Sequence, residues 1–217
     1  MSIEGLDVSK FQEKIDWSKV AQQCKFCFIR ASYGSDASFE RKFADHWSGA
    51  NSAGLICGAY HYLLPNKDDP NIDAQADLFL ATFRAAVGIA QLSYLPAAID
   101  VEEAVTSDPK RYLAAVERWV NRVEADALFR GRSTVIYTRK GVWDDIGDKS
   151  LSSHPLWVAD YSQNPPRLPR DWSRWTFFQY TDKGSVAGVS GNVDQDHFNG
   201  TMDDLVALTK PAGVPIA

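Results

Sequence analysis

The sequence predicts an α/β protein built as a single TIM-like barrel of eight strands, and three features lead to this prediction. Short apolar, β-prone runs alternate with amphipathic helical patterns over the first part of the chain. From Pro155 onward the alternation stops, and three more strand-like runs are joined by links rich in Pro and Ser. Acidic and aromatic residues recur where the runs end. Together these features favour a barrel that has lost some of its outer helices.

Eight runs have the composition of buried strands. The second is typical, because it is apolar and β-prone apart from Lys25 and Arg30, as expected for a parallel strand covered on both faces. The predicted strands are Ile3 to Val8, Cys24 to Tyr33, Leu55 to Leu64, the run from Leu95 that reaches Asp100, Ser133 to Thr138, Pro155 to Tyr161, Trp175 to Thr181 and Val189 to Phe198.

Helical patterns follow each of the first five strands. Apolar residues recur at a spacing of three to four, which marks the buried face of a helix. Asp16 is suited to cap the first helix, Gly54 to close the second, and Pro109 to occupy a first helical position. The predicted helices are Asp16 to Ala21, Phe39 to Ala53, Ile72 to Val87, Asp108 to Val123, a short one around Val142 and Trp143, and Thr201 to Leu208.

Length and charge indicate one globular domain over residues 1–217, which we expect to be a monomer. The formal net charge of −5 and the scattered basic residues argue against nucleic acid as a partner. No apolar run approaches the roughly 20 residues of a membrane span. The first residues, Met1 to Gly5, lack the features of a secretory signal, so export would use another route or the chain is a mature form.

Three cysteines, Cys24, Cys27 and Cys57, are too few and odd in number for a disulfide framework. Cys24 and Cys27 match the C-x-x-C pattern of redox and zinc sites. The pattern lies in an apolar strand, without a second pair or a histidine cluster nearby. We therefore expect the cysteines to act as small, buried hydrophobic residues.

The run that ends in Asp100-Val101-Glu102-Glu103 is the strongest functional signal. Side chains alternate between the two faces of a strand, so Asp100 and Glu102 project to the same side. The C-terminal end of a buried parallel strand opens into the cleft where barrel enzymes place their chemistry. Two carboxyl groups are therefore expected to share one cleft.

The other strand ends carry the same residue types. We expect this rim to form a cleft for sugars, because sugar rings pack on aromatic faces while hydroxyl groups bind carboxylates and amides. A phosphate ligand is disfavoured, because no glycine-rich cradle is present. The predicted rim contains Asp7, Tyr33, Tyr60, Tyr62, Asp100, Glu102, Tyr137, Asp160, Tyr161, Gln179, Tyr180, Asp194 and Asp196.

Glycoside hydrolysis requires one protonated carboxyl group and a second negative group near the anomeric carbon. The pair Asp100 and Glu102 supplies both, and we expect crowding by Asp7, Asp100 and Asp194 to raise the pKa of Glu102. Side chains two apart on one face have Cβ atoms roughly 6.5 Å apart, which leaves both the retaining and the inverting geometry open.

An ordered set of motifs resembles the family 25 glycoside hydrolases, which are lysozymes of the N-acetylmuramidase type. The resemblance covers nearly the whole chain. It implies one catalytic (β/α)5β3 barrel that cleaves the β-1,4 bond between N-acetylmuramic acid and N-acetylglucosamine in peptidoglycan, outside the cell or in the periplasm, with no metal or other cofactor. The motifs are Gly5-Leu6-Asp7-Val8-Ser9, Ile15-Asp16-Trp17, Phe28 to Gly34, Gly58 to Tyr62, Asp100-Val101-Glu102, Val135 to Thr138, Leu156 to Tyr161, Phe178-Gln179-Tyr180 and Val193-Asp194.

By position, the resemblance makes Glu102 the proton donor. Asp100 becomes either the nucleophile or the group that orients the substrate's own N-acetyl group, and Asp7 and Asp194 complete an acidic floor. Asp196 departs from the family's usual uncharged or basic residue, so we keep it only as a weak candidate. The expected substrate-binding residues are Tyr33, Tyr60, Tyr62, Tyr137, Trp157, Asp160 and Gln179.

Three alternatives qualify this interpretation. Trp157 and Gln179 can instead fill the barrel, and either the tyrosines at 60 and 62 or His61 face the interior, with a packed His61 preferred. A barrel metallohydrolase would use His61 and His197 as ligands, although four scattered histidines fit poorly. A catalytically silent sugar-binding protein would not need clustered carboxylates, whose repulsion costs stability.

Overall fold

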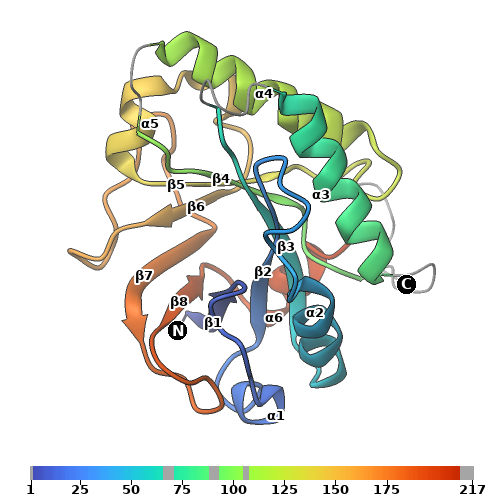
Figure 1. Cartoon of the computed structure of the whole chain (residues 1–217). Coiled ribbons are helices and arrows are strands. Elements are labelled where there is room, and N and C mark those ends of the chain that lie inside the picture. The colour runs from blue at the N-terminus through green and yellow to red at the C-terminus, as the bar shows by residue number, and fades with distance from the viewer. Residues whose placement is uncertain (1, 66–70, 88–92, 105–107, 211–217) are drawn as a thin grey trace.

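Eight strands close into a barrel in their chain order in the computed structural model, which describes residues 2–65, 71–87, 93–104 and 108–210 (Figure 1). Each predicted strand is present, with ends that differ by at most a few residues from the prediction. The strands are β1 (Ile3–Val8), β2 (Phe26–Tyr33), β3 (Ile56–Tyr62), β4 (Ala98–Val101), β5 (Val135–Thr138), β6 (Leu156–Ala159), β7 (Phe177–Gly184) and β8 (Val193–Phe198).

Neighbouring strands from β1 to β7 are parallel, whereas β8 is antiparallel to both β7 and β1. The link between β7 and β8 is too short for a helical crossover, so the chain turns back as a hairpin. We had expected all strands to end at the same rim. That expectation is wrong for β8, which starts at the rim where the other seven end.

Helices follow each of the first five strands, as predicted, and lie outside the barrel (Figure 1). Asp16 caps the first helix by accepting a hydrogen bond from the backbone N–H of Lys19, and Pro109 opens the fourth. The helices are α1 (Trp17–Val20), α2 (Phe43–Ser52), α3 (Ile72–Val87), α4 (Pro109–Ala125), α5 (Lys140–Ile146), the 3-10 turn η1 (Lys149–Leu151) and α6 (Met202–Ala207).

The second helix begins four residues later than predicted, at Phe43 instead of Phe39. The ring of Phe39 stacks on Tyr33, with centroids 4.1 Å apart, and lies below the ammonium group of Lys10. A tertiary contact therefore takes this residue out of the helical pattern.

Two apolar clusters hold the barrel together. Inside the barrel, rings from several strands fill the centre, and Phe28 stacks on Trp157 with centroids 4.6 Å apart. A second cluster lies between the strands and the outer helices, and it contains Trp17, Trp47 and Trp119. Interior and exterior are thus both packed, as in other closed barrels of this size.

His61 belongs to the outer layer, which confirms the packed interpretation. Its ring stacks on Trp119, and its two nitrogens contact the hydroxyl of Ser32 at 2.7 Å and the side-chain oxygen of Gln75 at 3.0 Å. Burial lowers the pKa of His61 to about 3, so the ring is neutral at ordinary pH. Tyr60 accordingly faces the interior.

The cysteines are buried free thiols, as expected. The thiol of Cys27 lies 3.6 Å from that of Cys57 on the neighbouring strand, not against Cys24. The C-x-x-C spacing therefore does not bring its own two cysteines together.

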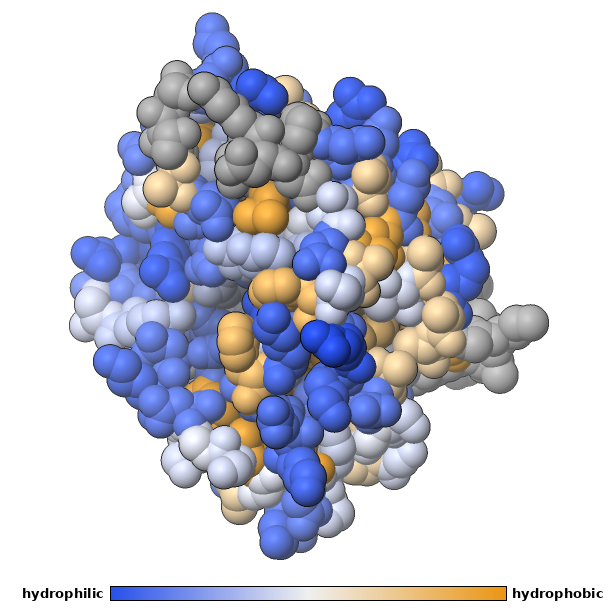
Figure 2. Space-filling model, in the orientation of Figure 1, coloured by the Kyte–Doolittle hydropathy of each residue, from blue (hydrophilic) through white to orange (hydrophobic). Residues whose placement is uncertain are grey.

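The outer surface carries only small groups of apolar side chains among hydrophilic ones in the view of Figure 2. Among the described residues, none of the helices combines the length and apolarity that crossing a bilayer requires.

Candidate active site

A pocket of about 230 Å³ opens at the rim where the parallel strands end. Every strand contributes to its wall, either directly or through the residues that follow it, and the wall unites most of the residues predicted from the sequence. The lining residues are Asp7, Ser9, Phe11, Arg30, Tyr60, Tyr62, Asp100, Glu102, Tyr137, Arg139, Trp157, Tyr161, Gln179, Asp182 and Asp194.

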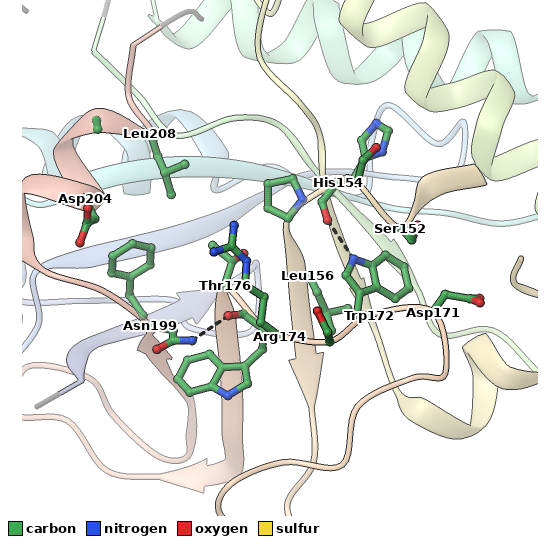
Figure 3. A pocket seen from close by; sticks show the side chains of 16 residues that line it. Ser152, His154, Leu156, Asp171, Trp172, Arg174, Thr176, Asn199, Asp204 and Leu208 are labelled. Carbon is green, nitrogen blue, oxygen red and sulfur yellow. Dashed lines mark hydrogen bonds between the residues drawn. The ribbon is translucent and has the colours of Figure 1, made fainter. Parts of the chain in front are cut away.

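A larger hollow of about 620 Å³ lies at the opposite end of the barrel, beside the starts of β6 and β7 (Figure 3). Two hydrogen bonds join polar groups of its wall. The indole N–H of Trp172 donates to the backbone carbonyl of His154, and the side-chain amide of Asn199 donates to the backbone carbonyl of Trp175. None of the predicted site residues lines it. Size alone therefore does not identify the active site, and the carboxyl groups place it in the smaller pocket.

Asp100 and Glu102 line the same pocket, as the alternation of side chains along a strand predicted. Asp100 is the third residue of β4, and Glu102 follows directly after the strand ends at Val101. Asp100 is 6% exposed, and its Oδ1 atom makes no hydrogen bond to any residue that the structure describes. A buried oxygen of this kind is suited to accept a hydrogen bond from a bound molecule.

The pKa of Glu102 is raised, chiefly because the carboxyl group is buried, and the neighbouring Glu103 raises it further. The expected direction is confirmed, but burial is a larger cause than the predicted crowding by acids. The charge of Glu102 interacts with Asp100 and Asp194, and burial together with that charge raises the pKa of Asp100 well above its usual value.

Arg139 opposes the rise in the pKa of Glu102. Its Nη2 atom lies 3.3 Å from Oε2 of Glu102, and its guanidinium group lies over the ring of Tyr161 at 5.5 Å. The sequence interpretation missed this residue, although it directly follows the predicted strand that ends at Thr138. The rim is thus acidic but not purely so.

Asp7 and Asp194 are directly opposite each other in the register of β1 and β8. Asp194 was expected at the end of the last strand but is the second residue of β8. Because β8 runs antiparallel, its start lies at the same rim as the end of β1, and the two acids still meet. Burial raises the pKa of Asp194 to about 6, and the charges of Asp182 and Glu102 contribute to the shift.

A chain of hydrogen bonds through Gln179 holds the carboxyl group of Asp7 in place. The Oε1 atom of Gln179 accepts hydrogen bonds from the hydroxyl groups of Tyr137 at 2.8 Å and Tyr161 at 2.6 Å. The amide nitrogen of Gln179 is therefore directed to Asp7, and it donates to Oδ2 at 2.6 Å. Burial raises the pKa of Asp7 well above its usual value, as do the nearby acids, first among them Asp194.

Trp157 and Gln179 form part of the pocket floor, with exposed fractions of 1% and 3%. Both are also barrel filling, so the two interpretations of these residues are not exclusive. Asp196 does not line the pocket: it is fully buried inside the barrel and accepts a hydrogen bond from Trp157.

The remaining predicted residues divide between the pocket and its surroundings. Tyr60 and Tyr62 line the pocket, and the hydroxyl of Tyr62 donates to Glu103 at 2.8 Å. Tyr33 lies one layer away, stacked on Tyr62 with centroids 4.7 Å apart. Tyr180 faces the outside of the barrel, where its hydroxyl donates to Glu4, so its expected place at the rim is wrong.

Asp160 lies in an adjoining depression instead of the pocket. Its carboxylate accepts hydrogen bonds from the backbone and guanidinium of Arg167 and from Ser162. These contacts lower the pKa of Asp160 despite partial burial.

Further lining residues were not foreseen, among them Phe11, Arg30 and Asp182. Phe11 is 71% exposed and presents an aromatic face at the mouth of the pocket. Its position just after the end of β1, four residues beyond Asp7, could have indicated that it lies at the same rim. Arg30 is buried and forms an ion pair with Glu40, which lies beyond the end of β2 in the sequence.

The histidines required by a barrel metallohydrolase do not reach the pocket. His61 is packed in the outer layer, and His197 lies 2.8 Å from Glu4 and against the ring of Tyr180. Within residues 2–65, 71–87, 93–104 and 108–210, no group of three His, Cys, Asp or Glu side chains is arranged to hold a metal ion. The donor set favours acid and base chemistry by carboxyl groups.

Comparison with known proteins agrees with this chemistry. The family described as glycosyl hydrolases family 25 matches residues 6–189. The uncharacterized protein YegX of Escherichia coli O157:H7 is 35% identical over 213 residues, which are 95% of this chain and 73% of that protein. Lysozyme M1 of Streptomyces globisporus is 33% identical over 219 residues, covering 95% of this chain and 71% of the lysozyme.

A solved structure shares the whole architecture. The bacterial lysozyme from Streptomyces coelicolor superposes with a TM-score of 0.84 at 30% sequence identity, covering 96% of this chain and 97% of the lysozyme chain.

Proposed function

Because the chain belongs to the glycosyl hydrolases of family 25, we propose that it is a lysozyme that hydrolyses the β-1,4 bond between N-acetylmuramic acid and N-acetylglucosamine in peptidoglycan. The observation that carries the proposal is the pair of carboxyl groups, the buried Asp100 and the partly buried Glu102, which both line the pocket. Its place of action is then the cell wall, outside the cell or in the periplasm.

Glu102 is assigned as the proton donor to the leaving oxygen. A general acid must keep its proton near neutral pH, and burial raises the pKa of Glu102 in that direction. Its side chain remains 24% exposed, so the carboxyl group is accessible from the pocket.

Asp100 is assigned as the second negative group, acting either as the nucleophile or as the orienting partner of the substrate's N-acetyl group, and the charges of Arg30 and Arg139 favour its charged form against the effect of burial. Both roles require a carboxylate oxygen that is not already engaged by the protein. The Oδ1 atom of Asp100, which has no partner among the described residues, meets this requirement.

Asp7 and Asp194 are assigned to the acidic floor that stabilises the positive charge developing on the sugar ring. Preorganised charges in a buried site act strongly because water screens them little. Gln179 holds Asp7 in place through a 2.6 Å hydrogen bond. The exposed ring of Phe11 and the tyrosines at 60 and 62 provide faces on which sugar rings pack.

Digestion of purified peptidoglycan tests the proposal. The wild type should release fragments with N-acetylmuramic acid at the new reducing end. Glu102→Gln should lower the rate by about 10²–10⁴-fold, the usual contribution of a general acid. Asp203→Asn, at an exposed position on α6, serves as the matched control and should retain activity.

Two outcomes would contradict the proposal. Reducing N-acetylglucosamine would identify a different bond. Binding of peptidoglycan without any released fragment would favour the catalytically silent sugar-binding protein.

A further inference from the structure

A second depression of about 370 Å³ adjoins the active-site pocket. It is formed by the residues that follow β5 and β6, and it shares Arg139 and Tyr161 with the active-site pocket. We call it the cationic pocket. Its lining residues are Arg139, Lys140, Gly141, Ala159, Asp160, Tyr161, Ser162 and Arg167.

The two pockets differ sharply in charge. Three basic side chains, Arg139, Lys140 and Arg167, and one acid line the cationic pocket. Five acids and two arginines line the active-site pocket. The cationic pocket is also unusual for a chain of net charge −5, whose basic residues are otherwise scattered. Such a pocket favours an anionic group.

The basic side chains are held in place yet remain accessible. The Nε atom of Arg167 lies 2.9 Å from Asp160, and the ammonium group of Lys140 lies 2.5 Å from Asp144. Exposed fractions of 58% and 42% leave about half of each side chain open to a ligand. Arginine is particularly suited to bind a planar carboxylate through two parallel hydrogen bonds.

The substrate carries anions on a peptide that is attached to one of the two sugars joined by the bond that is cut. N-Acetylmuramic acid bears a lactyl ether to which a short peptide with free carboxylates is attached. We propose that the cationic pocket binds a carboxylate of this peptide stem while the sugar occupies the active-site pocket, which would make the enzyme selective for stem-bearing glycan strands. This inference rests on the proposed lysozyme function.

Arg139 links the two pockets. It lies 3.3 Å from Glu102 on one side and lines the cationic pocket on the other. A stem carboxylate bound beside it competes with Glu102 for the guanidinium group. Binding of the correct substrate would thus weaken the ion pair that favours the charged form of Glu102, and so favour the protonated acid.

The test compares two substrates. One is purified peptidoglycan with its peptide stems, and the other is the same material after an amidase has removed the stems and the lactyl carboxylates released by that cleavage have been converted to amides. The wild type should have a higher kcat/KM on stem-bearing strands. Lys140→Ala and Arg167→Ala should each lower kcat/KM about tenfold on stem-bearing strands, the worth of one charge-assisted hydrogen bond, and leave it unchanged on stem-free strands.

Arg174→Ala is the matched control, because this exposed arginine lines the hollow at the opposite end of the barrel. It should leave kcat/KM unchanged on both substrates. Should Arg167→Ala fail to fold because Asp160 loses its partner, Lys140→Ala still decides the matter.

Three results would overturn the inference. The first is equal cleavage of both substrates by the wild type. The second is an equal loss of activity by the variants on both substrates, which indicates a structural role. The third is disappearance of the loss after phosphate-containing polymers are stripped from the wall, which identifies phosphate as the ligand. Failure of the wild type to cleave either substrate would instead contradict the proposed function.

Discussion

The indole nitrogen of Trp157 donates a 2.8 Å hydrogen bond to Oδ1 of Asp196 inside the barrel. The other oxygen of Asp196 makes no hydrogen bond to any described residue. Burial raises the pKa of both Asp196 and Asp7, and the charge of Asp196 raises that of Asp7 further, so we expect these two acids to retain one proton between them.

Asp196→Asn should therefore preserve the fold, whereas Asp196→Ala should not. Asparagine still accepts the hydrogen bond from Trp157 and is uncharged, as the protonated acid is. Alanine leaves the buried indole N–H unsatisfied, at a cost of about 1–3 kcal/mol in the free energy of unfolding. Urea denaturation of both variants measures the difference, and equal destabilisation of the two would contradict the retained proton.

The same pair also predicts how stability depends on pH. In the unfolded chain the aspartates release their protons near pH 4, whereas the folded protein holds one at higher pH. The contribution of this pair to the free energy of unfolding therefore falls as pH rises above about 4, toward the raised pKa of the folded state. Because Asn does not titrate, Asp196→Asn should become more stable relative to the wild type between pH 4 and pH 7. A difference that does not change with pH would argue against the pair.

Arg139→Gln should extend activity to higher pH. The guanidinium group favours the charged form of Glu102, so its removal raises the pKa of the proton donor further. The decline of kcat/KM on the basic side of the pH profile should then move to higher pH. The measurement is a pH profile on stem-free glycan strands, with Arg174→Ala as the control. A decline that stays at the same pH or moves to lower pH would show that Arg139 does not lower the pKa of the proton donor.

Asp194→Asn should lower kcat by about a hundredfold, because a preorganised negative charge is lost from the floor. In the wild type, activity should decline as pH falls below about 6, where Asp194 takes up a proton. This acidic limb should be absent from the variant. An unchanged limb in Asp194→Asn would assign it to another carboxyl group of the cluster.

Much of the fold and part of the site followed from local patterns. The period of two along a strand was sufficient to place Asp100 and Glu102 on one side, and the short apolar runs were sufficient to find Asp7 at a strand end. Similarly, alternation showed that Tyr60 and His61 face opposite ways. It did not determine which of them faces inward, because both faces of this strand are buried.

The remaining features depended on contacts between distant segments. An apolar run does not show its direction, so the antiparallel path of β8, and with it the pairing of Asp194 with Asp7, emerged only when the barrel closed. The pairing of Arg139 with Glu102 and of Arg167 with Asp160 likewise depends on where loops from different strands meet. Local patterns along the chain were enough to identify the residues that can carry charge at the rim. Closure of the barrel set which of those charges lie within reach of each other, because electrostatic interactions depend on distance and burial, not on separation along the chain.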